Sequence, residues 1–510
     1  MTTATSPTAP LPTHRASRRA QALDTASLTG QLRHRSVRGV VATSGTQTFK
    51  FVNNLITGAI LARLLTPADF GVIAMAAAFT GLAAVLRHGG LSIGIIQREH
   101  VSHAQVNRLF WLNGFIAAST ACILAASGPL LAWLYNEPRV FMVMAILSIT
   151  TFLGGLGAVS ESIIRRQMRF GVLTAIEISA LVGGSLTGLL LAWNGFGLYA
   201  LVWMQVVSAA IVATGMCLSS GWRPGWPTLR SSLKDRKANQ KITQLGGQVT
   251  LSSLLSYACR RIDNVLLGIT YGAGALGLYA KAYNMLLLPI QQINGPVCAA
   301  ATPTLCRLKD RPDDFRRAYL AGIAMTAGLG MLPVAWMWAA AEPLIAVLFG
   351  PQWNDAVPLF EALALAALAG TFNTADTWLM IPHGRGAKQL RLTFVTTVII
   401  ATGYIVALPW GVRAVALSFS FTAIITKLGA VAWASHGTSV SFRAVLSNLA
   451  PPTLAALIAA SATRLLLVYG SPHVDVPPFV SAFIAGLFCS AVYLTTLVAQ
   501  PAGRRIIRDV

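Results

Sequence analysis

Charged residues and long hydrophilic segments are what this sequence has least of. Only 11% of its 510 residues are charged and 55% are hydrophobic, whereas an ordinary soluble domain is about 25% charged. The connections between apolar stretches are short, and only residues 221–243 form a longer one. The sequence therefore leaves no room for a soluble catalytic domain and predicts an all-α polytopic membrane protein.

Several motifs of soluble chemistry are also missing. There is no GxxxxGK[ST] phosphate-binding loop and no HExxH metal motif, and the 6 cysteines lack CxxC spacing. Residues 1–38 contain no apolar segment of the kind found in a signal peptide, so we expect the first span to act as an uncleaved anchor. We accordingly predict no catalytic residues, no metal ligands and no cofactor.

The apolar runs predict about fourteen transmembrane helices, since a span needs roughly 20 mostly apolar residues. Their predicted starts lie near Val41, Phe70, Ala104, Phe141, Gly171, Phe196, Gln244, Leu276, Ala318, Val357, Leu392, Val412, Leu446 and Pro478.

Basic residues give the predicted orientation, because cytoplasmic loops carry an excess of Lys and Arg. If the N-terminus is cytoplasmic, residues 165–169, 223–241 and 307–317 are internal, and the external connections hold only Arg139 and Arg413. Both termini are then cytoplasmic, as residues 1–40, predicted to be disordered, and 501–510. The net charge of +22 thus follows from topology and does not indicate nucleic-acid binding.

The sequence also repeats itself. "LLTPADFGVIAMAAAFTGL" (64–82) resembles "ITYGAGALGLYAKAYNMLL" (269–287), and "GPLLAWLYNEP" (128–138) resembles "AEPLIAVLFGPQW" (341–353). The repeat encloses an even number of spans, so both copies keep one orientation. We therefore predict two parallel lobes around a central cavity, at residues 41–220 and 244–435. Residues 221–243 connect them, and two additional helices follow in 436–500.

Ionisable and amide side chains within the predicted spans mark the candidate site, because intramembrane charges are costly and usually face protein or water. The candidates for substrate binding in a cationic cavity are Lys50, Asn53, Asn54, Arg260, Arg261 and Lys281. The candidates for cation coupling or ion pairing are Asp263, Glu177, Glu361 and Asp376. Arginine and lysine suit phosphate or carboxylate, so the predicted cargo has an anionic head.

Helical spacing separates the two neighbouring arginines. Arg260 shares a helix face with Asp263, whereas Arg261 points elsewhere and is the freer charge. Three alternatives stay open. Arg260 and Asp263 could form a buried pair that fixes helix packing, Lys281 could extend to the outer interface, and the acidic residues could be hydrogen-bonding groups between helices.

Two extended patterns carry a family resemblance. "LARLLTPADFGVIAMAAAFTGLAAVLRHGGLSIGIIQREHVSHAQVNRLFWLN" (61–113) and "RRIDNVLLGITYGAGALGLYAKAYNMLLLP" (260–289) resemble signatures of bacterial Wzx-type polysaccharide flippases. These proteins form the polysaccharide transporter family of the MOP superfamily, and this chain is similar to the branch that includes colanic acid exporters. The match spans roughly residues 41–433.

The resemblance implies a V-shaped cavity and alternating access. The implied cargo is an undecaprenyl-diphosphate-linked oligosaccharide, moved across the bacterial inner membrane, with coupling to Na⁺ or H⁺ left open. Membrane lipids, a polysaccharide polymerase and export machinery are the implied partners. The alternatives are a lipid II flippase or another cation-coupled exporter of the superfamily, a membrane polymerase or ligase of the same pathway, and a scaffold without transport.

Overall fold

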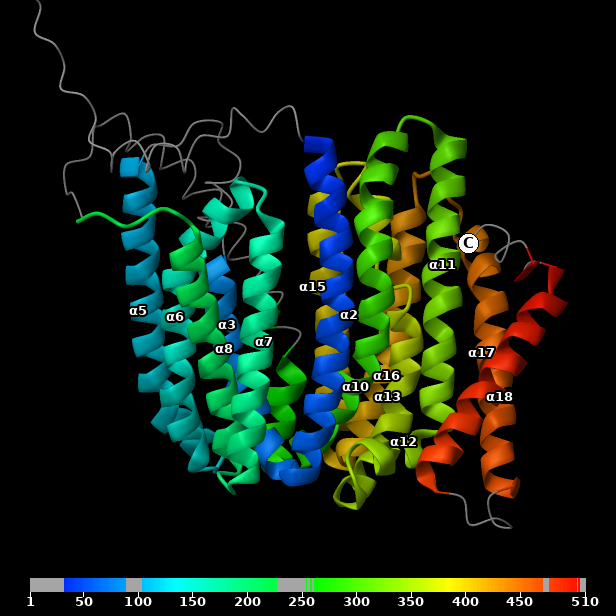
Figure 1. Cartoon of the computed structure of the whole chain (residues 1–510). Helices are drawn as coiled ribbons and strands as arrows, with labels where there is room; N and C mark the ends of the chain where they lie inside the picture. The colour runs from blue at the N-terminus through cyan, green and yellow to red at the C-terminus, as the bar shows by residue number, and fades with distance from the viewer. Residues whose placement is uncertain are drawn as a thin grey trace, which may run out of the picture.

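The computed structural model describes residues 32–88, 103–226, 254, 257, 258, 261–470, 477–501, 503 and 504. Every regular element in these residues is an α-helix or a 3-10 helix, as predicted. Twelve of the described helices are long and apolar enough to cross a membrane. Figure 1 shows them running roughly side by side in two groups.

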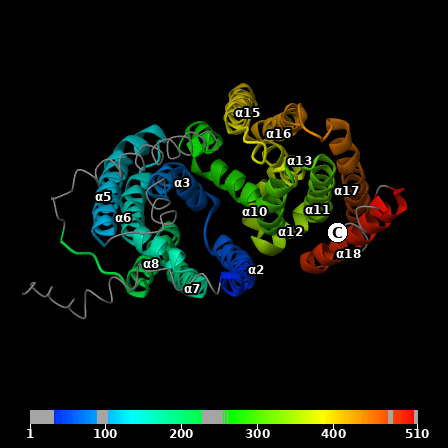
Figure 2. The same cartoon turned by 90° about the horizontal axis from the view of Figure 1, so that it is seen from above.

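The first lobe is built from six long helices. They are α2 (Leu32–Leu64), α3 (Pro67–His88), α5 (His103–Leu134), α6 (Arg139–Arg166), α7 (Phe170–Trp193) and α8 (Leu198–Ser219). Seen from above, α2 lies between the remaining helices of this lobe and the second lobe (Figure 2). It packs on α7 of its own lobe and also touches α10 and α12 of the other.

The second lobe contains more broken helices. Its elements are α10 (Ile262–Leu308), α11 (Pro312–Ala339), α12 (Ala341–Leu348), η2 (Pro351–Ala356), α13 (Val357–Gly370), α14 (Ala375–Met380), α15 (Gly386–Ala407), η3 (Leu408–Trp410) and α16 (Val412–Ser435). The two additional helices are α17 (Phe442–Gly470) and α18 (Pro478–Ala499). They pack on α11 at the far side from the first lobe (Figure 2).

Two interruptions shape the second lobe. Gly272 divides α10 at φ 76° and ψ −175°, a conformation that only glycine adopts without strain. A turn over residues 371–374 separates α13 from α14. Irregular backbone at membrane depth is tolerated where protein or a cavity satisfies its polar groups. The sequence predicts one continuous span from Val357, so this break is a feature that only the structure reveals.

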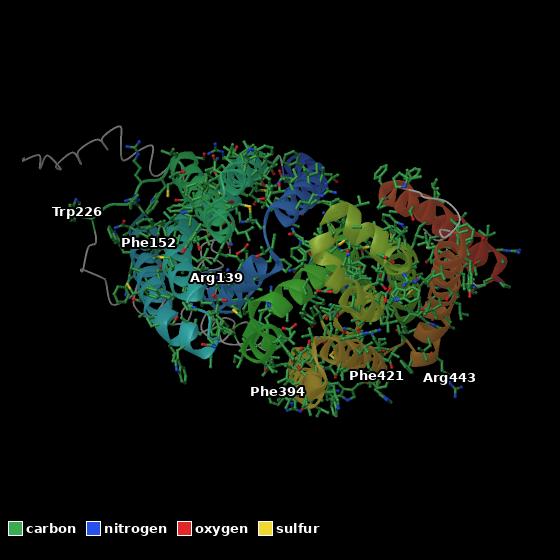
Figure 3. The ribbon with its side chains drawn as sticks, turned by 90° about the horizontal axis from the view of Figure 1, so that it is seen from below. Arg139, Phe152, Trp226, Phe394, Phe421 and Arg443 are labelled. Carbon is green, nitrogen blue, oxygen red and sulfur yellow. The ribbon has the colours of Figure 1, made fainter. Side chains whose placement is uncertain are left out.

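Large apolar side chains cover the perimeter, as expected for a protein whose solvent is lipid. Phe394 of α15 and Phe421 of α16 are 57% and 68% exposed, and Figure 3 shows Phe394 at the outer rim. Inside, one buried apolar cluster runs from Val72 and Met75 of α3 to Leu276 of α10 and Phe360 of α13. The two lobes therefore share a continuous core where they meet.

The predicted spans and the observed helices agree closely. Every predicted start has a described helix except the one near Gln244, which lies outside the described residues together with Arg260 and most of 221–243. Helix α2 begins at Leu32 rather than Val41, so the end of the segment predicted to be disordered is helical. That added stretch is basic, as suits a helix extending beyond the membrane.

Candidate functional site at the interface between the lobes

The lobes meet where α3 crosses α10, through two glycines in equivalent positions. A Cβ atom at Gly71 would overlap the carbonyl of Ala273, and one at Gly277 would overlap the carbonyl of Pro67. An offset of 206 residues relates Gly71 to Gly277 and also Pro67 to Ala273. The residue that Gly71 packs on is therefore the equivalent of the residue that Gly277 packs on, as in a two-fold interface. Small residues permit this close backbone approach.

The end of α2 is closed by donors from the second lobe. Gln352 Nε2 donates to the carbonyls of Ala62 at 2.5 Å and Leu65 at 3.1 Å, and Trp353 Nε1 donates to Ala62 at 2.8 Å. Arg63 in turn donates to the carbonyl of Val347. The last carbonyls of a helix lack partners within it, so the opposite lobe supplies them. We call this region, with the glycine crossing, the interlobe seal.

Lys281, predicted to bind cargo, lies within the interlobe seal. Its Nζ donates to the carbonyl of Gly58 in α2 at 2.9 Å. It also lies 4.5 Å, 4.7 Å and 5.9 Å from the ring centroids of Phe70, Phe349 and Trp353. Aromatic faces attract a cation, and the attraction grows where water is excluded. In this conformation Lys281 therefore joins α10 to the first lobe.

Lys50 and Asn53, also predicted to bind cargo, contact α7 of their own lobe. Lys50 Nζ lies 2.6 Å from Glu177 Oε2, and Asn53 Nδ2 donates to Ser185 Oγ at 2.8 Å. Glu177 thus neutralises the charge that Lys50 would bring to a cavity. Asn54 is exposed and shares the face of α2 that carries Gly58 toward the second lobe.

Arg261 and Asp263 flank the start of α10. Arg261 is partly exposed, and its guanidinium lies 5.7 Å from the ring centroid of Tyr257. The buried Asp263 carboxylate accepts hydrogen bonds from the Asn264 N–H at 2.7 Å and the Tyr279 hydroxyl at 3.3 Å. The pairing of Arg260 with Asp263 stays a prediction, because Arg260 lies outside the described residues.

The two remaining acidic candidates each meet a basic residue in the second lobe. Asp376 Oδ1 lies 2.6 Å from Lys427 Nζ, which also donates to the carbonyl of Asn373 in the turn between α13 and α14. Glu361 of α13 lies 2.9 Å from Arg464 of α17. These pairs tie the broken helix to α16 and to the additional helices. Among the described residues, no cluster of three His, Cys, Asp or Glu side chains could hold a metal ion.

A cavity of about 830 Å³ lies within the second lobe. Helices α10, α13, α14, α15 and α16 line it, and the Asp376–Lys427 pair forms part of its wall. The sequence analysis did not predict this cavity. A signal was present, because Gln389, Thr393, Thr396 and Thr397 form a polar stripe at helical spacing along the N-terminal half of α15.

The family comparison identifies the chain. A model of the family described as polysaccharide biosynthesis protein matches residues 60–358, more than half of the sequence. The chain belongs to this family. The predicted relationship to proteins of polysaccharide biosynthesis is therefore confirmed, and the matched residues include both sides of the interlobe seal.

Curated relatives extend the match. The chain is 27% identical over 464 residues to the succinoglycan biosynthesis transport protein ExoT of Rhizobium meliloti, covering 90% of this chain and 91% of that protein. It is 24% identical over 336 residues to the teichuronic acid biosynthesis protein TuaB of Bacillus subtilis, covering 65% and 68%. It is 22% identical over 317 residues to the lipopolysaccharide biosynthesis protein WzxC of Escherichia coli, covering 62% and 63%.

Solved structures share the fold. The lipid II flippase MurJ in an inward closed conformation superposes with a TM-score of 0.70 at 14% identity, covering 90% of this chain and 98% of that one. An inward-facing multidrug resistance MATE family transporter of the MOP superfamily gives a TM-score of 0.61 at 17% identity, covering 76% and 93%. At these identities the likeness establishes the two-lobed fold alone.

Proposed function

We propose that this protein translocates undecaprenyl-diphosphate-linked oligosaccharide repeat units across the bacterial inner membrane, for the synthesis of a surface polysaccharide. Membership of a polysaccharide biosynthesis family and a relative named as a succinoglycan transport protein support this. The observation that carries the proposal is the interlobe seal, because two similar lobes joined by reversible contacts near one end are suited to alternating access. One further bond between the lobes, from Gln292 Nε2 of α10 to the carbonyl of Gln47 in α2 at 3.2 Å, lies farther along both helices.

The predicted orientation indicates which end of the transporter is closed in this conformation. The interlobe seal is formed by residues next to connections predicted to be external, around Pro67, Ala273 and Trp353. With both termini cytoplasmic, the periplasmic end is closed and cargo enters from the cytoplasmic side. To open toward the periplasm, the glycine crossing and the hydrogen bonds to α2 must separate while each lobe moves as a rigid body.

The contacts of the interlobe seal are weak enough to be reversible. A net hydrogen bond contributes about 0.5–1.5 kcal/mol, and a cation–π contact about 0.5–2 kcal/mol. Cargo shifts such an equilibrium only by binding the two conformations with different affinity. Separation of the lobes would release Lys281 from Phe70 and from the carbonyl of Gly58 in the first lobe, so its ammonium would become available to an anionic head group at that stage.

Arg261 is the proposed contact for the diphosphate in the conformation described here. Its guanidinium is partly exposed, and Tyr257 supports it through its ring face. An arginine fork matches phosphate oxygens and keeps its charge at any physiological pH. The proposed translocation makes and breaks no covalent bond, so it requires no catalytic residues.

The deciding experiment compares a deletion strain with its parent. Lipid-linked repeat units are counted on the cytoplasmic face of the inner membrane, and polysaccharide is measured outside the cell. Complete units accumulating inside, with none exported, support translocation. Units that reach the periplasmic leaflet and stay unpolymerised would instead identify a polymerase, ligase or scaffold.

A variant pair tests the head-group contact. Arg261→Ala should abolish export while the protein still inserts, because the diphosphate loses its positive partner. Arg443→Ala is the matched control, since Arg443 is exposed at the start of α17 near the edge of the molecule (Figure 3). Unchanged export with Arg261→Ala would remove Arg261 from the proposed mechanism.

A further inference from the structure

We infer that the second-lobe cavity is a subsite for the glycan of the cargo, and that it binds neutral, hydroxyl-rich sugar rather than the diphosphate. This inference rests on the proposed function and adds where the sugar is held. The cavity measures about 830 Å³, within the roughly 300–1,000 Å³ usual for small-molecule sites. It therefore accommodates a short stretch of glycan and not a whole lobe-sized cargo.

Several N–H donors on the cavity wall are bonded within the protein, and the side chains of Gln291 and Asn373 line it as well. Asn294 Nδ2 donates to the carbonyl of Gly370 at 3.1 Å, and Gln389 Nε2 donates to Asp376 Oδ2 at 3.0 Å. Lys427 Nζ donates to Asp376 and to the carbonyl of Asn373, both at 2.6 Å. Because Asp376 and Lys427 neutralise each other, the wall presents no free cation of the kind a diphosphate requires.

The threonine hydroxyls on the wall also donate their hydrogen bonds within their own helices. The hydroxyls of Thr393, Thr396 and Thr397 donate to backbone carbonyls of α15 at 3.0 Å, 3.0 Å and 2.7 Å. The hydroxyl of Thr426 does the same in α16 at 2.6 Å. Their oxygen lone pairs are left as acceptors, since a hydroxyl has one proton and two lone pairs.

Unpartnered buried oxygens lie among the same lining residues. Asn294 Oδ1, Gln389 Oε1 and Thr374 Oγ1 are buried without a hydrogen-bond partner among the described residues. An orphan buried polar atom costs about 1–3 kcal/mol, so such atoms usually indicate a missing ligand or water. These atoms have almost no surface open to the cavity, so a ligand reaches them only after a small side-chain movement. Together with the row of threonine oxygens they make this wall rich in acceptors.

Sugar hydroxyls both donate and accept hydrogen bonds, so they suit a wall of acceptor oxygens and side-chain amides, whereas a diphosphate needs positive charge that the Asp376–Lys427 pair does not offer. An aromatic surface completes the match. The rings of Tyr283 and Phe419 lie edge to face with centroids 5.6 Å apart, and both residues line the cavity. The apolar C–H face of a sugar ring packs well on such a surface. A bare cation would also meet acceptors here, so the test must separate the two.

Cys298 provides a native reporter because it lines the cavity and is a free thiol. In a variant that keeps only this cysteine, reconstituted in nanodiscs, the alkylation rate of Cys298 is measured with a small maleimide. The probes are complete lipid-linked units extracted from the deletion strain, undecaprenyl diphosphate without sugar, and sodium chloride compared with choline chloride.

The inference expects complete units to slow alkylation saturably, with no effect of undecaprenyl diphosphate or sodium. Equal protection by undecaprenyl diphosphate would place the head group in the cavity and overturn the inference. Equal protection by sodium would identify a cation site, and the absence of protection by any probe would show that no glycan enters. The last three results all contradict a glycan subsite.

Isosteric variants test the acceptors directly. Thr393→Val and Thr397→Val together remove two acceptor oxygens with little change of shape. We expect the half-protecting concentration of complete units to rise about tenfold. Thr402→Val is the control, because Thr402 makes the same bond within α15, to Val398 at 2.9 Å, but is exposed and does not line the cavity.

The outcomes separate this inference from the proposed function. If the deletion strain still exports polysaccharide, the proposed function fails and the subsite falls with it. If deletion abolishes export but Cys298 is never protected and the double variant behaves like Thr402→Val, translocation stands and only the glycan subsite is wrong. Equal expression and thermal stability of the variants exclude misfolding as the cause.

Discussion

In the first lobe, Lys50 and Glu177 form an ion pair whose side chains are 29% and 33% exposed; in the second, Lys427 and Asp376 form one whose side chains are 15% and 7% exposed. The second pair also supports a broken helix and a cavity, whereas the first joins two continuous helices. Yet both lobes meet through equivalent glycines. The internal repeat has thus kept its backbone contacts and diverged in its chemistry.

Because Gly71 and Gly277 are equivalent at the interlobe seal, we expect substitution of either one to reduce export equally and strongly. Gly71→Ala and Gly277→Ala should each abolish export, because the added Cβ would overlap a carbonyl of the other lobe and overpacking costs about 1–3 kcal/mol. Gly274→Ala, next to this crossing, is the control, since a Cβ there meets nothing within 4 Å.

The opening itself can be measured with the same variants. A cysteine at position 62, in the added substitution Ala62→Cys, should become reactive to a membrane-impermeant maleimide from outside, because Ala62 is buried where Trp353 and Gln352 cap α2. If one glycine variant opens the protein and the other does not, the two-fold equivalence of the lobes is broken.

The two ion pairs should differ in stability. Asp376→Ala should cost about 3–5 kcal/mol of unfolding free energy, because it leaves Lys427 buried without its carboxylate. Glu177→Ala should cost about 1 kcal/mol or less, since Lys50 is more exposed. Thermal unfolding of the purified protein in one detergent compares them, and equal losses would contradict the distinction between the lobes.

Lys281 contributes contacts to the interlobe seal that have no equivalent in the other copy of the repeat. Lys281→Met should weaken closure by about 1–2 kcal/mol, because it removes the two contacts that cross to the first lobe, the cation over the Phe70 ring and the bond to the Gly58 carbonyl. Reactivity of Ala62→Cys from outside should rise, with unfolding temperature nearly unchanged. A large fall in unfolding temperature instead would mean that Lys281 is needed for folding.

The smallest effect is expected at the turn between α5 and α6 of the first lobe. Arg139 contacts Glu137 at 2.8 Å and Asp69 at 3.3 Å, and its hydrogen bond lowers the pKa of Glu137 below the ordinary 4.5. A lowered pKa means that this stabilisation is present above pH 4.5 and is lost as the pH falls through the folded-state pKa.

We expect that loss to be below about 1 kcal/mol, because Arg139 is partly exposed and the pair is screened. Thermal unfolding measured from pH 6 down to pH 3 checks it against Glu137→Gln, which should flatten this part of the profile. An identical pH profile for the variant and the wild-type protein would show that Glu137 contributes nothing there.

Much of the architecture could be predicted because membrane insertion imposes strong local rules. Apolar length identified the spans, and the resemblance of residues 64–82 to 269–287 indicated two parallel lobes. The same rules do not predict which side chains pair with one another in the folded protein. Sequence analysis placed Lys50 among the cargo contacts, and nothing local could reveal that Glu177, far along the chain, lies 2.6 Å away.

The sequence by itself determined the helical membrane fold, its repeat and the membrane-embedded polar residues, because hydropathy and helical period act over short distances. Only the tertiary structure decided what those residues do. It enclosed Lys281 among rings from both lobes, and it placed the threonine stripe of α15 in one cavity with the turn between α13 and α14. Such sites depend on how helices pack, and packing is a property of the whole chain.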